Sequence, residues 1–339
     1  MDKLVLFNTN ALNAMLKKRP NESKFGEHIK ILPNFTTIYD ALTTLDVDYV
    51  IFGIPEDVGV FANYGKRGAA SAWEATLKVL LNIQSNSFTN PDKVLILGYL
   101  DFYKEMEKVD SLNQTNKIDI QKARKLVAKM DTHVTDLVCQ IVKAGKTPII
   151  IGGGHNNAYG AIKGTSLALQ KSINTVNFDA HSDFRSEEGR HSGNGFSYAY
   201  AEGFLKNYFI FGLHENYTSD IIFKTLNKFK SIQYNTFEAI SIRHELSFKA
   251  EMERASKFVS EKPFGIEIDC DAIKNIPSSA MTPSGFSVKK ARRFINYFGP
   301  FENVKYLHIC EAAPTLETET KVGKLISFLI TDFMRAHSN

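Results

Sequence analysis

Short apolar segments rich in Val, Ile, Leu and Phe recur along the chain, and they are apolar on both faces. The segments are VDYVIFGI, KVLILGYL, TPIIIGGG, INTVNFDA, NYFIFGLH, PFGIEIDCD and VKYLHICEA. Strands that are covered by helices on both sides of a parallel sheet have this composition. The pattern therefore predicts the strands of a mostly parallel sheet.

Helical patterns lie between these segments. The clearest runs from about Ile118 to Ala144, where apolar residues recur at spacings of three and four, and another, KVGKLISFLITDFMRA, closes the chain. The alternation predicts a single-domain α/β fold, a doubly wound, mostly parallel sheet flanked by helices in three layers. We expect this domain to occupy residues 46–339, and the polar, irregular residues 1–45 to form an N-terminal arm or lid-like segment.

Composition and charge exclude several classes of protein. The 339 residues are 43% hydrophobic and carry a net charge of +4, with no long Lys/Arg block that would follow a nucleic acid. No segment approaches the roughly twenty apolar residues of a membrane span, and the N-terminus lacks a signal-peptide pattern. Three cysteines without CxxC spacing indicate neither a disulfide framework nor a thiolate zinc site. We expect a cytoplasmic protein that binds neither nucleic acid nor membrane.

Ionisable residues gather where four of the predicted strands end. Ligands of open α/β sheets bind beyond the carboxyl ends of the strands, where loops and helix N-termini converge. The residues at these ends are His155 after PIIIGGG, then Asp179, His181 and Asp183 in NFDAHSDFR, Asp269 and Asp271 in GIEIDCDA, and Glu311 in YLHICEAAP. The sequence thus predicts one cluster of carboxylates and imidazoles.

The spacing within this cluster indicates a metal centre. Asp179, His181 and Asp183 alternate, as do Asp269 and Asp271, so an extended backbone points each set to one side. Buried carboxylates without counter-charge would have to take up protons, whereas two divalent cations remove their repulsion. An oxygen-rich set with two imidazoles favours Mn²⁺, although Zn, Fe, Co and Ni stay open. A structural ion-pair network would need basic partners, and only Arg185 is available in these motifs.

The motifs GGGHN, DAHSDFR, DCDA and EAAP, in this order, resemble those of the ureohydrolase family of arginases, agmatinases and formimidoylglutamases, from about residue 48 to the end. The resemblance implies an arginase-like three-layer fold, two Mn²⁺ per chain and a possible homo-oligomer. It implies that one metal is bound by His155, Asp179, Asp183 and Asp269, and the other by Asp179, His181, Asp269 and Asp271.

Within the family, the segment GIPEDVGVFANYGKRGAASAWEATLKVLLN and the Ser-Gly of RHSGNGF are most similar to formimidoylglutamases. The segment DCDAIKNIP departs from the family, whose members commonly have Asp-Pro there. The implied activity is hydrolysis of N-formimino-L-glutamate to L-glutamate and formamide, a reaction of histidine degradation, by a hydroxide that bridges the metals. The alternatives are an arginase, agmatinase or other guanidino-acid hydrolase releasing urea, a single-zinc deacetylase-like enzyme, and a non-catalytic metal-binding relative.

The resemblance also gives roles to individual residues. Glu311 holds the amidine or guanidinium group, and Asp183, His191 or a water supplies the proton for the leaving nitrogen. The expected catalytic residues are therefore Asp183, Glu311 and His191, and the expected substrate-binding residues are Glu311, Arg185, Ser192 and Asn194. A substrate tail with carboxylates needs fixed cations, and the nearest basic residues by motif are Arg185, Arg190, Lys66 and Arg67.

Overall fold

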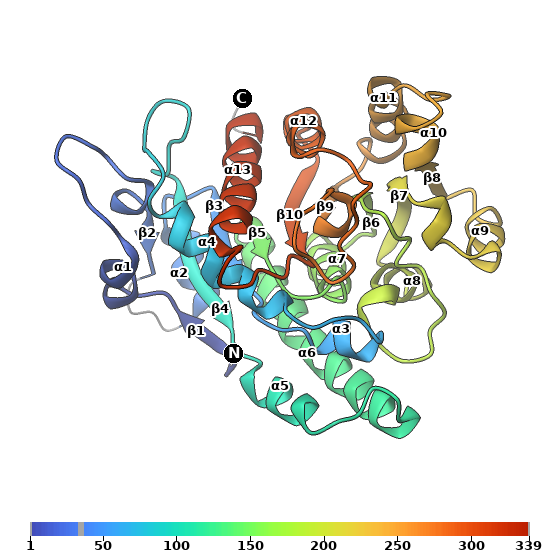
Figure 1. Ribbon diagram of the computed structural model, residues 1–339. Coiled ribbons are helices and arrows are strands. Elements are labelled where there is room, and N and C mark those ends of the chain that lie inside the picture. Colours follow the sequence, from blue (N-terminus) through green and yellow to red (C-terminus); the bar gives the residue numbers. More distant parts are fainter. Residues whose placement is uncertain (1, 33–36, 338–339) are drawn as a thin grey trace.

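A ten-stranded sheet forms the centre of the protein in the computed structural model, which describes residues 2–32 and 37–337 (Figure 1). The strands are β1 (Leu4–Leu6), β2 (Lys30–Ile31), β3 (Tyr49–Gly53), β4 (Val94–Leu100), β5 (Thr147–Ile151), β6 (Ile173–Phe178), β7 (Leu205–Leu213), β8 (Ile232–Thr236), β9 (Phe264–Asp269) and β10 (Val304–Cys310). Their order is β1-β4-β3-β5-β10-β9-β6-β7-β8, and β2 also pairs with β4. Only the β1 to β4 pairing is antiparallel among the described strands.

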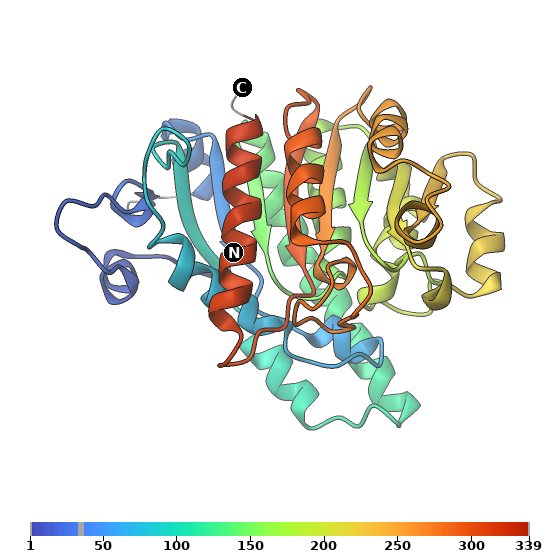
Figure 2. The ribbon, with the colours of Figure 1, turned by 45° about the horizontal axis from the view of Figure 1, so that its top comes forward.

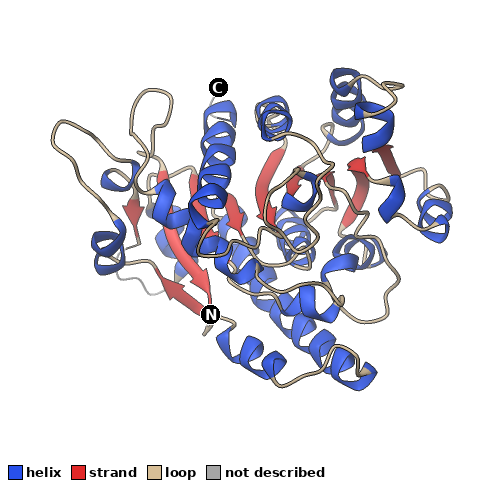
Figure 3. Ribbon diagram, in the orientation of Figure 1, coloured by secondary structure: helices blue, strands red, loops and turns tan. Residues whose placement is uncertain are grey.

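Helices cover both faces of the sheet, each over its own apolar core (Figures 2 and 3). One face is packed by α1 (Thr9–Met15), α4 (Ala72–Leu80), α10 (Phe237–Ser241), α11 (Phe248–Val259), α12 (Val288–Phe298) and α13 (Glu319–His337). The other is packed by α2 (Ile38–Thr44), α3 (Val58–Ala62), α5 (Tyr103–Asp110), α6 (Lys117–Lys143), α7 (Asn157–Leu169), α8 (Gly195–Ala201) and α9 (Asp220–Leu226). The prediction of a three-layer, doubly wound α/β domain is confirmed.

The seven apolar segments are all strands, and the periodic segment from Ile118 to Ala144 is helix α6. Three strands were missed: β1 and β2 are only three and two residues long, and β8 has the mixed sequence IQYNT. β1 and β8 lie at the two edges of the sheet, where one side of a strand has no strand partner and a continuous apolar run is not required. Of the N-terminal segment expected as an arm or lid, β1 and β2 both pair with β4, and Phe25 is fully buried.

Two further expectations from the sequence concern membrane-spanning segments and disulfides. None of the helices in the described ranges combines the length and apolarity that crossing a bilayer requires. Cys139, Cys270 and Cys310 are free thiols, and the last two are buried.

The strand order brings the four predicted strand ends together. β5, β10, β9 and β6 are consecutive neighbours in the sheet and run parallel, so their carboxyl ends share one edge. β9 and β10 come later in the chain than β5 and β6 but lie between them in the sheet. Residues from positions 155, 179, 269 and 311 are thereby placed at one crevice of the sheet.

Candidate metal centre and substrate cavity

His155 lies at the centre of the carboxylate cluster. Its Nδ1 atom is 2.8 Å from Oδ2 of Asp183, 3.1 Å from Oδ2 of Asp269 and 3.4 Å from Oδ2 of Asp179. The imidazole is fully buried, and neither ring nitrogen has a hydrogen-bond partner among the described residues. A buried imidazole of this kind, facing three carboxylates, is typical of a metal ligand rather than of a satisfied core histidine.

His181 lies at the outer side of the same cluster. Its Nδ1 atom is 3.6 Å from Oδ1 of Asp179 and 3.7 Å from Oδ2 of Asp271. Each Asp that ends a strand also accepts a backbone hydrogen bond of 2.7 Å from the residue two positions later: Asp179 from His181, and Asp269 from Asp271. These local turns hold the alternating side chains on one side of the backbone.

The six predicted ligands therefore meet in two overlapping sets, each with its ligand atoms within 4.8 Å of one another. One set is His155, Asp179, Asp183 and Asp269, and the other is His181, Asp269 and Asp271. Burial, followed by repulsion from Asp179, raises the pKa of Asp183 and Asp269. Bound cations would remove this cost, so the oxygen and nitrogen donors present fit a pair of divalent metals.

In the loop that carries His155, the backbone at Gly153 lies too close to neighbouring side chains for a larger residue. Gly153 has φ of +74°, and a Cβ atom there would lie 2.5 Å from Nδ2 of Asn157 and 2.9 Å from Oε1 of Glu56. Glu56 is fully buried and accepts hydrogen bonds from the backbone of Val58 and Gly154 and from the side chain of Asn157. These contacts tie the loop after β3 to the loop after β5.

Glu311 faces the metal cluster from the end of β10. It is 3% exposed and has φ of +61°, a strained conformation for a residue with a side chain. Its Oε1 atom accepts a 2.7 Å hydrogen bond from the backbone N–H of His155, while Oε2 has no partner among the described residues. Burial, followed by repulsion from Asp271, raises the pKa of Glu311 to about 8. Without bound cations the carboxyl is therefore mostly neutral at pH 7, and a cationic group placed beside it would favour its charged form.

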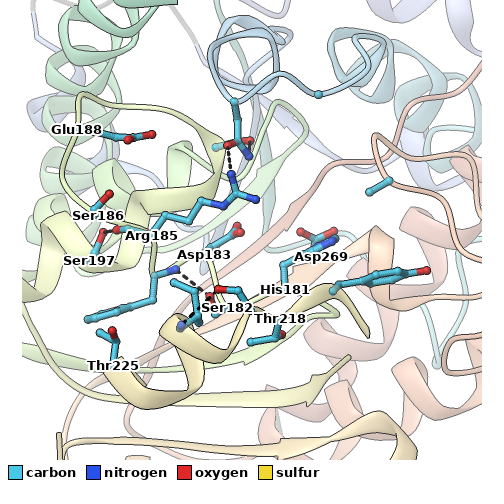
Figure 4. Close-up of a pocket in the computed structure, with 18 of the residues that line it drawn as sticks. His181, Ser182, Asp183, Arg185, Ser186, Glu188, Ser197, Thr218, Thr225 and Asp269 are labelled. Carbon is cyan, nitrogen blue, oxygen red and sulfur yellow. Dashed lines mark hydrogen bonds between the residues drawn. The ribbon is translucent and has the colours of Figure 1, made fainter. Parts of the chain in front are cut away.

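A cavity of about 880 Å³ opens next to the cluster and is lined by Asp183, His181, Asp269, Asp271 and Glu311. Figure 4 shows several of these residues, together with Arg185, which extends from the loop that carries Ser186 and Glu188. Arg185 is the one Arg or Lys among the described lining residues. Its Nη1 atom donates a 3.2 Å hydrogen bond to Oδ1 of Asn63, and Nδ2 of Asn63 donates to Oγ of Ser192.

Asn194 and Arg190, which the sequence predicts near the substrate, lie outside the lining of this cavity. Asn194 does not line the cavity: its Oδ1 atom accepts from Arg190, and its Nδ2 atom donates to the backbone of Gly189. Arg190 is buried, with Nε 2.9 Å from Oδ2 of Asp131 and its guanidinium over the ring of Tyr159. Both side chains hold the loop after β6 through these contacts.

Some of the remaining polar residues predicted near the substrate line the cavity and others do not. Ser192 lines the cavity, as expected, whereas Lys66 and Arg67 do not, and Arg67 is paired with Asp57. His191 is fully buried outside the lining, and its Nδ1 atom accepts from the backbone of Gly193. Burial and then nearby arginines lower the pKa of His191 to about 3, so the ring is neutral and is a poor proton donor to a leaving group.

Buried polar residues behind the cluster were missed by the sequence analysis. Glu267 and His308 are fully buried on β9 and β10, with Nδ1 of His308 2.6 Å from Oε2 of Glu267. Burial raises the pKa of Glu267, but His308 and His155 outweigh it and bring the value to about 2. A signal was available, because Glu267 extends the alternation of Asp269 and Asp271 one step inward.

Comparison with known proteins gives the family of this chain. A sequence profile of the arginase family matches residues 47–335. The chain belongs to the arginase family, whose formimidoylglutamase relatives are hydrolases of carbon–nitrogen bonds in linear amidines. The expected family and class of enzyme are thereby confirmed.

Individual relatives lie at low sequence identity. Formimidoylglutamases of Streptococcus gordonii and Streptococcus pyogenes serotype M12 are 23% and 24% identical over 84% and 86% of this chain and 83% and 86% of their own. The structure of formimidoylglutamase from Bacillus subtilis matches with a TM-score of 0.74 at 17% identity, covering 95% of this chain and 94% of that one. A Trypanosoma cruzi formiminoglutamase variant with two Mn²⁺ matches with a TM-score of 0.71 at 19% identity, covering 89% and 98%. These structures show the arginase fold.

Proposed function

We propose that this protein is a manganese-dependent amidine hydrolase that converts N-formimino-L-glutamate to L-glutamate and formamide. The observation that carries the proposal is the pairing of two overlapping carboxylate–imidazole sets with the unpartnered Oε2 atom of Glu311 at the wall of one cavity. A hydrolase of this class needs a metal-activated water and a buried anion for the cationic substrate carbon, and the site offers places for both.

The six clustered residues would hold two Mn²⁺. Asp269 belongs to both ligand sets, and Asp179, a member of the first set, also lies 3.6 Å from Nδ1 of His181 in the second. When bound, the metals supply positive charge that lowers the pKa of a water towards neutrality. The curated relatives named formimidoylglutamase and the Trypanosoma cruzi structure with two Mn²⁺ support this choice of metal and reaction.

Glu311 would accept a charge-assisted hydrogen bond from the planar N–C–N group and turn one face of its carbon towards the metal cluster. Asp183 lines the cavity and lies in the cluster, so it is placed to take a proton from the attacking water and pass it to the leaving nitrogen. We assign this transfer to Asp183 and not to His191, because His191 lies outside the cavity lining and its lowered pKa of about 3 favours a neutral ring.

Arg185 would bind a carboxylate of the substrate tail. Its guanidinium is held by Asn63, which is in turn held by Ser192, so the orientation of Arg185 is fixed before substrate arrives. A second carboxylate would meet the hydroxyls of Ser186, Thr218 and Ser219, which also line the cavity. This arrangement accommodates formiminoglutamate with one bidentate contact and one neutral polar contact.

A second candidate is a guanidine substrate that releases urea. Glu187 and Glu188 line the same cavity and would favour a cationic tail, such as the amine of agmatine, over a carboxylate. A solved structure of a hypothetical agmatinase from Burkholderia thailandensis also has this fold, with a TM-score of 0.64 at 17% identity over 86% of this chain and 87% of that one.

A substrate panel separates these functions. The Mn²⁺-loaded protein is assayed with formiminoglutamate, arginine, agmatine, guanidinobutyrate and guanidinopropionate, and formamide or urea is measured. Formamide release from formiminoglutamate with the highest kcat/KM supports the proposal and is the result expected of an enzyme of histidine degradation. Preference for a guanidine would replace it with a ureohydrolase, and absence of any turnover would indicate a non-catalytic metal-binding relative.

A further inference from the structure

A buried polar layer crosses the sheet directly behind the metal centre. In the strand register Glu267 on β9 lies opposite Asn177 on β6 and His308 on β10. All three side chains are fully buried within strands that are otherwise mainly apolar. Asn177 donates a 2.9 Å hydrogen bond to Oδ2 of Asp179, so this layer already contacts one proposed ligand.

Glu267 lies between His308 and the metal-facing His155. Its Oε1 atom accepts a 2.7 Å hydrogen bond from the hydroxyl of Tyr306, and its Oε2 atom is 2.6 Å from Nδ1 of His308. The same Oε2 atom is 3.5 Å from Nε2 of His155. His155 therefore has its Nδ1 atom towards the carboxylates of the centre and its Nε2 atom towards Glu267.

The ring of His155 is also confined from another direction. Phe196 packs against it edge-on, with ring centroids 5.1 Å apart. Packing of this kind restricts the plane of the ring but does not choose which nitrogen carries the proton. The carboxylate of Glu267 lies 3.5 Å from Nε2, outside hydrogen-bond geometry, and its negative charge favours the proton on Nε2, which leaves the lone pair of Nδ1 free for a cation.

We infer that Glu267 is a positioning residue that fixes the ring orientation and tautomer of His155 for metal binding, while His308 and Tyr306 hold its carboxylate in place. The inference rests on the proposed metal centre and does not depend on which amidine is the substrate. If Glu267 served only to pair with His308, its substitution would change stability and leave metal affinity unaltered. Outer carboxylates that orient a ligating histidine change metal affinity by about 10- to 100-fold.

The test is a titration of metal-free protein with Mn²⁺ in competition with a chromophoric chelator, without substrate. We expect Glu267→Gln to weaken one of the two Mn²⁺ by about 10- to 100-fold and to affect the other much less. Glu251→Gln is the matched control, because Glu251 is also a buried carboxylate, bonded to Asn235 and Arg254 away from the centre. We expect this control to bind both Mn²⁺ as the wild type does.

The outcomes are distinguishable. Wild-type affinity for both Mn²⁺ in Glu267→Gln would overturn the positioning role and leave the proposed function standing. Failure of the wild type itself to bind two Mn²⁺ would overturn the proposed centre, and this inference with it. If Glu267→Gln does not fold, Tyr306→Phe decides: it keeps the carboxylate and removes one of its donors, and we expect a several-fold loss of affinity for one Mn²⁺, whereas no change would refute the inference.

Discussion

Replacing Glu311 with Gln removes the charge that this carboxyl would carry beside bound cations or a cationic substrate, and it keeps the shape of the side chain. Oε1 of Gln can still accept the hydrogen bond from the backbone of His155, so the loop contact survives. The atom that changes is the one corresponding to Oε2, which is buried and has no hydrogen-bond partner among the described residues, in a side chain that lines the cavity. An amide there cannot supply the negative charge that a cationic amidine needs.

The loss is a charge-assisted interaction in a buried site that orients the reacting group. Such an interaction contributes about 2 to 4 kcal/mol of transition-state stabilisation, which corresponds to a fall of roughly 30- to 900-fold in kcat/KM. The assay is formamide release from formiminoglutamate by Mn²⁺-loaded protein, with metal content measured on the same samples. Glu187→Gln is a suitable control, because Glu187 lines the same cavity but is exposed.

The same substitution should raise the stability of the metal-free protein. The folded-state pKa of Glu311 is about 8, above its ordinary value of 4.5, so the native state holds a proton that the unfolded state releases. This contribution to the free energy of unfolding is complete below the unfolded pKa and is lost as pH rises towards 8. At pH 7 the loss amounts to at most about 3 kcal/mol. Gln lacks this penalty, so urea unfolding at pH 7 should show a more stable variant. Near-normal turnover, or lost stability with unchanged turnover, would refute the role given to Glu311.

Three further predictions test the remaining parts of the site. Asp179→Ala should lose both of the roughly two Mn²⁺ per chain, because its carboxylate is shared, and elemental analysis that still finds a pair would contradict the ligand assignment. Arg185→Met should raise KM for formiminoglutamate by about tenfold or more and leave KM for a tail-less amidine nearly unchanged. Lys66→Met is the control, because Lys66 lies outside the cavity lining. Equal losses of kcat/KM for both substrates would contradict a tail contact. His191 has a folded pKa of about 3, so the metal-free protein should lose free energy of unfolding as pH falls below 6.5, by about 2 kcal/mol at pH 5. His191→Asn keeps an acceptor for the Gly193 N–H, and between pH 7.5 and pH 5 its free energy of unfolding in urea titrations should fall by about 2 kcal/mol less than that of the wild type. Equal losses in the two proteins would contradict a neutral ring.

The central strands could be predicted from the sequence because they are buried on both faces. A segment such as TPIII or FGIEID has few polar residues, so its hydrophobic run is continuous and bounded by glycine or charge. β1, β2 and β8 follow a different rule, since the two edge strands have one unpaired side and β2 forms only two register pairs with β4. Short contacts of that kind depend on tertiary pairing, which a local pattern does not contain.

The metal cluster could be predicted for a similar reason. Period-two spacing fixes which side chains of a strand end point together, and parallel strands place their carboxyl ends at one edge. What the pattern lacks is the direction of a side chain after the backbone leaves the strand. Arg185 and Arg190 stand on the same loop, yet Arg185 lines the cavity and Arg190 turns to Asp131 on α6.

That partner explains why the tail-binding residues could not be read from sequence position. Asp131 is a buried acid on a helix that is remote from the loop in sequence, and it requires a buried cation, which Arg190 provides. Arg190 pairs with Asp131, and Asn194 accepts a hydrogen bond from the same guanidinium. Both side chains therefore lie on the side of the loop that faces away from the cavity. In the described parts of the chain Arg185 forms no ion pair, and its guanidinium donates to the neutral amide of Asn63, so its charge would be available to the carboxylate that we propose it binds. The ion pair with Asp131 thus holds Arg190 on the far side of the loop, outside the cavity lining. Asp131→Asn would remove that ion pair, while Arg190 would keep its hydrogen bonds to Oδ1 of Asn194 and to the backbone of Asn156.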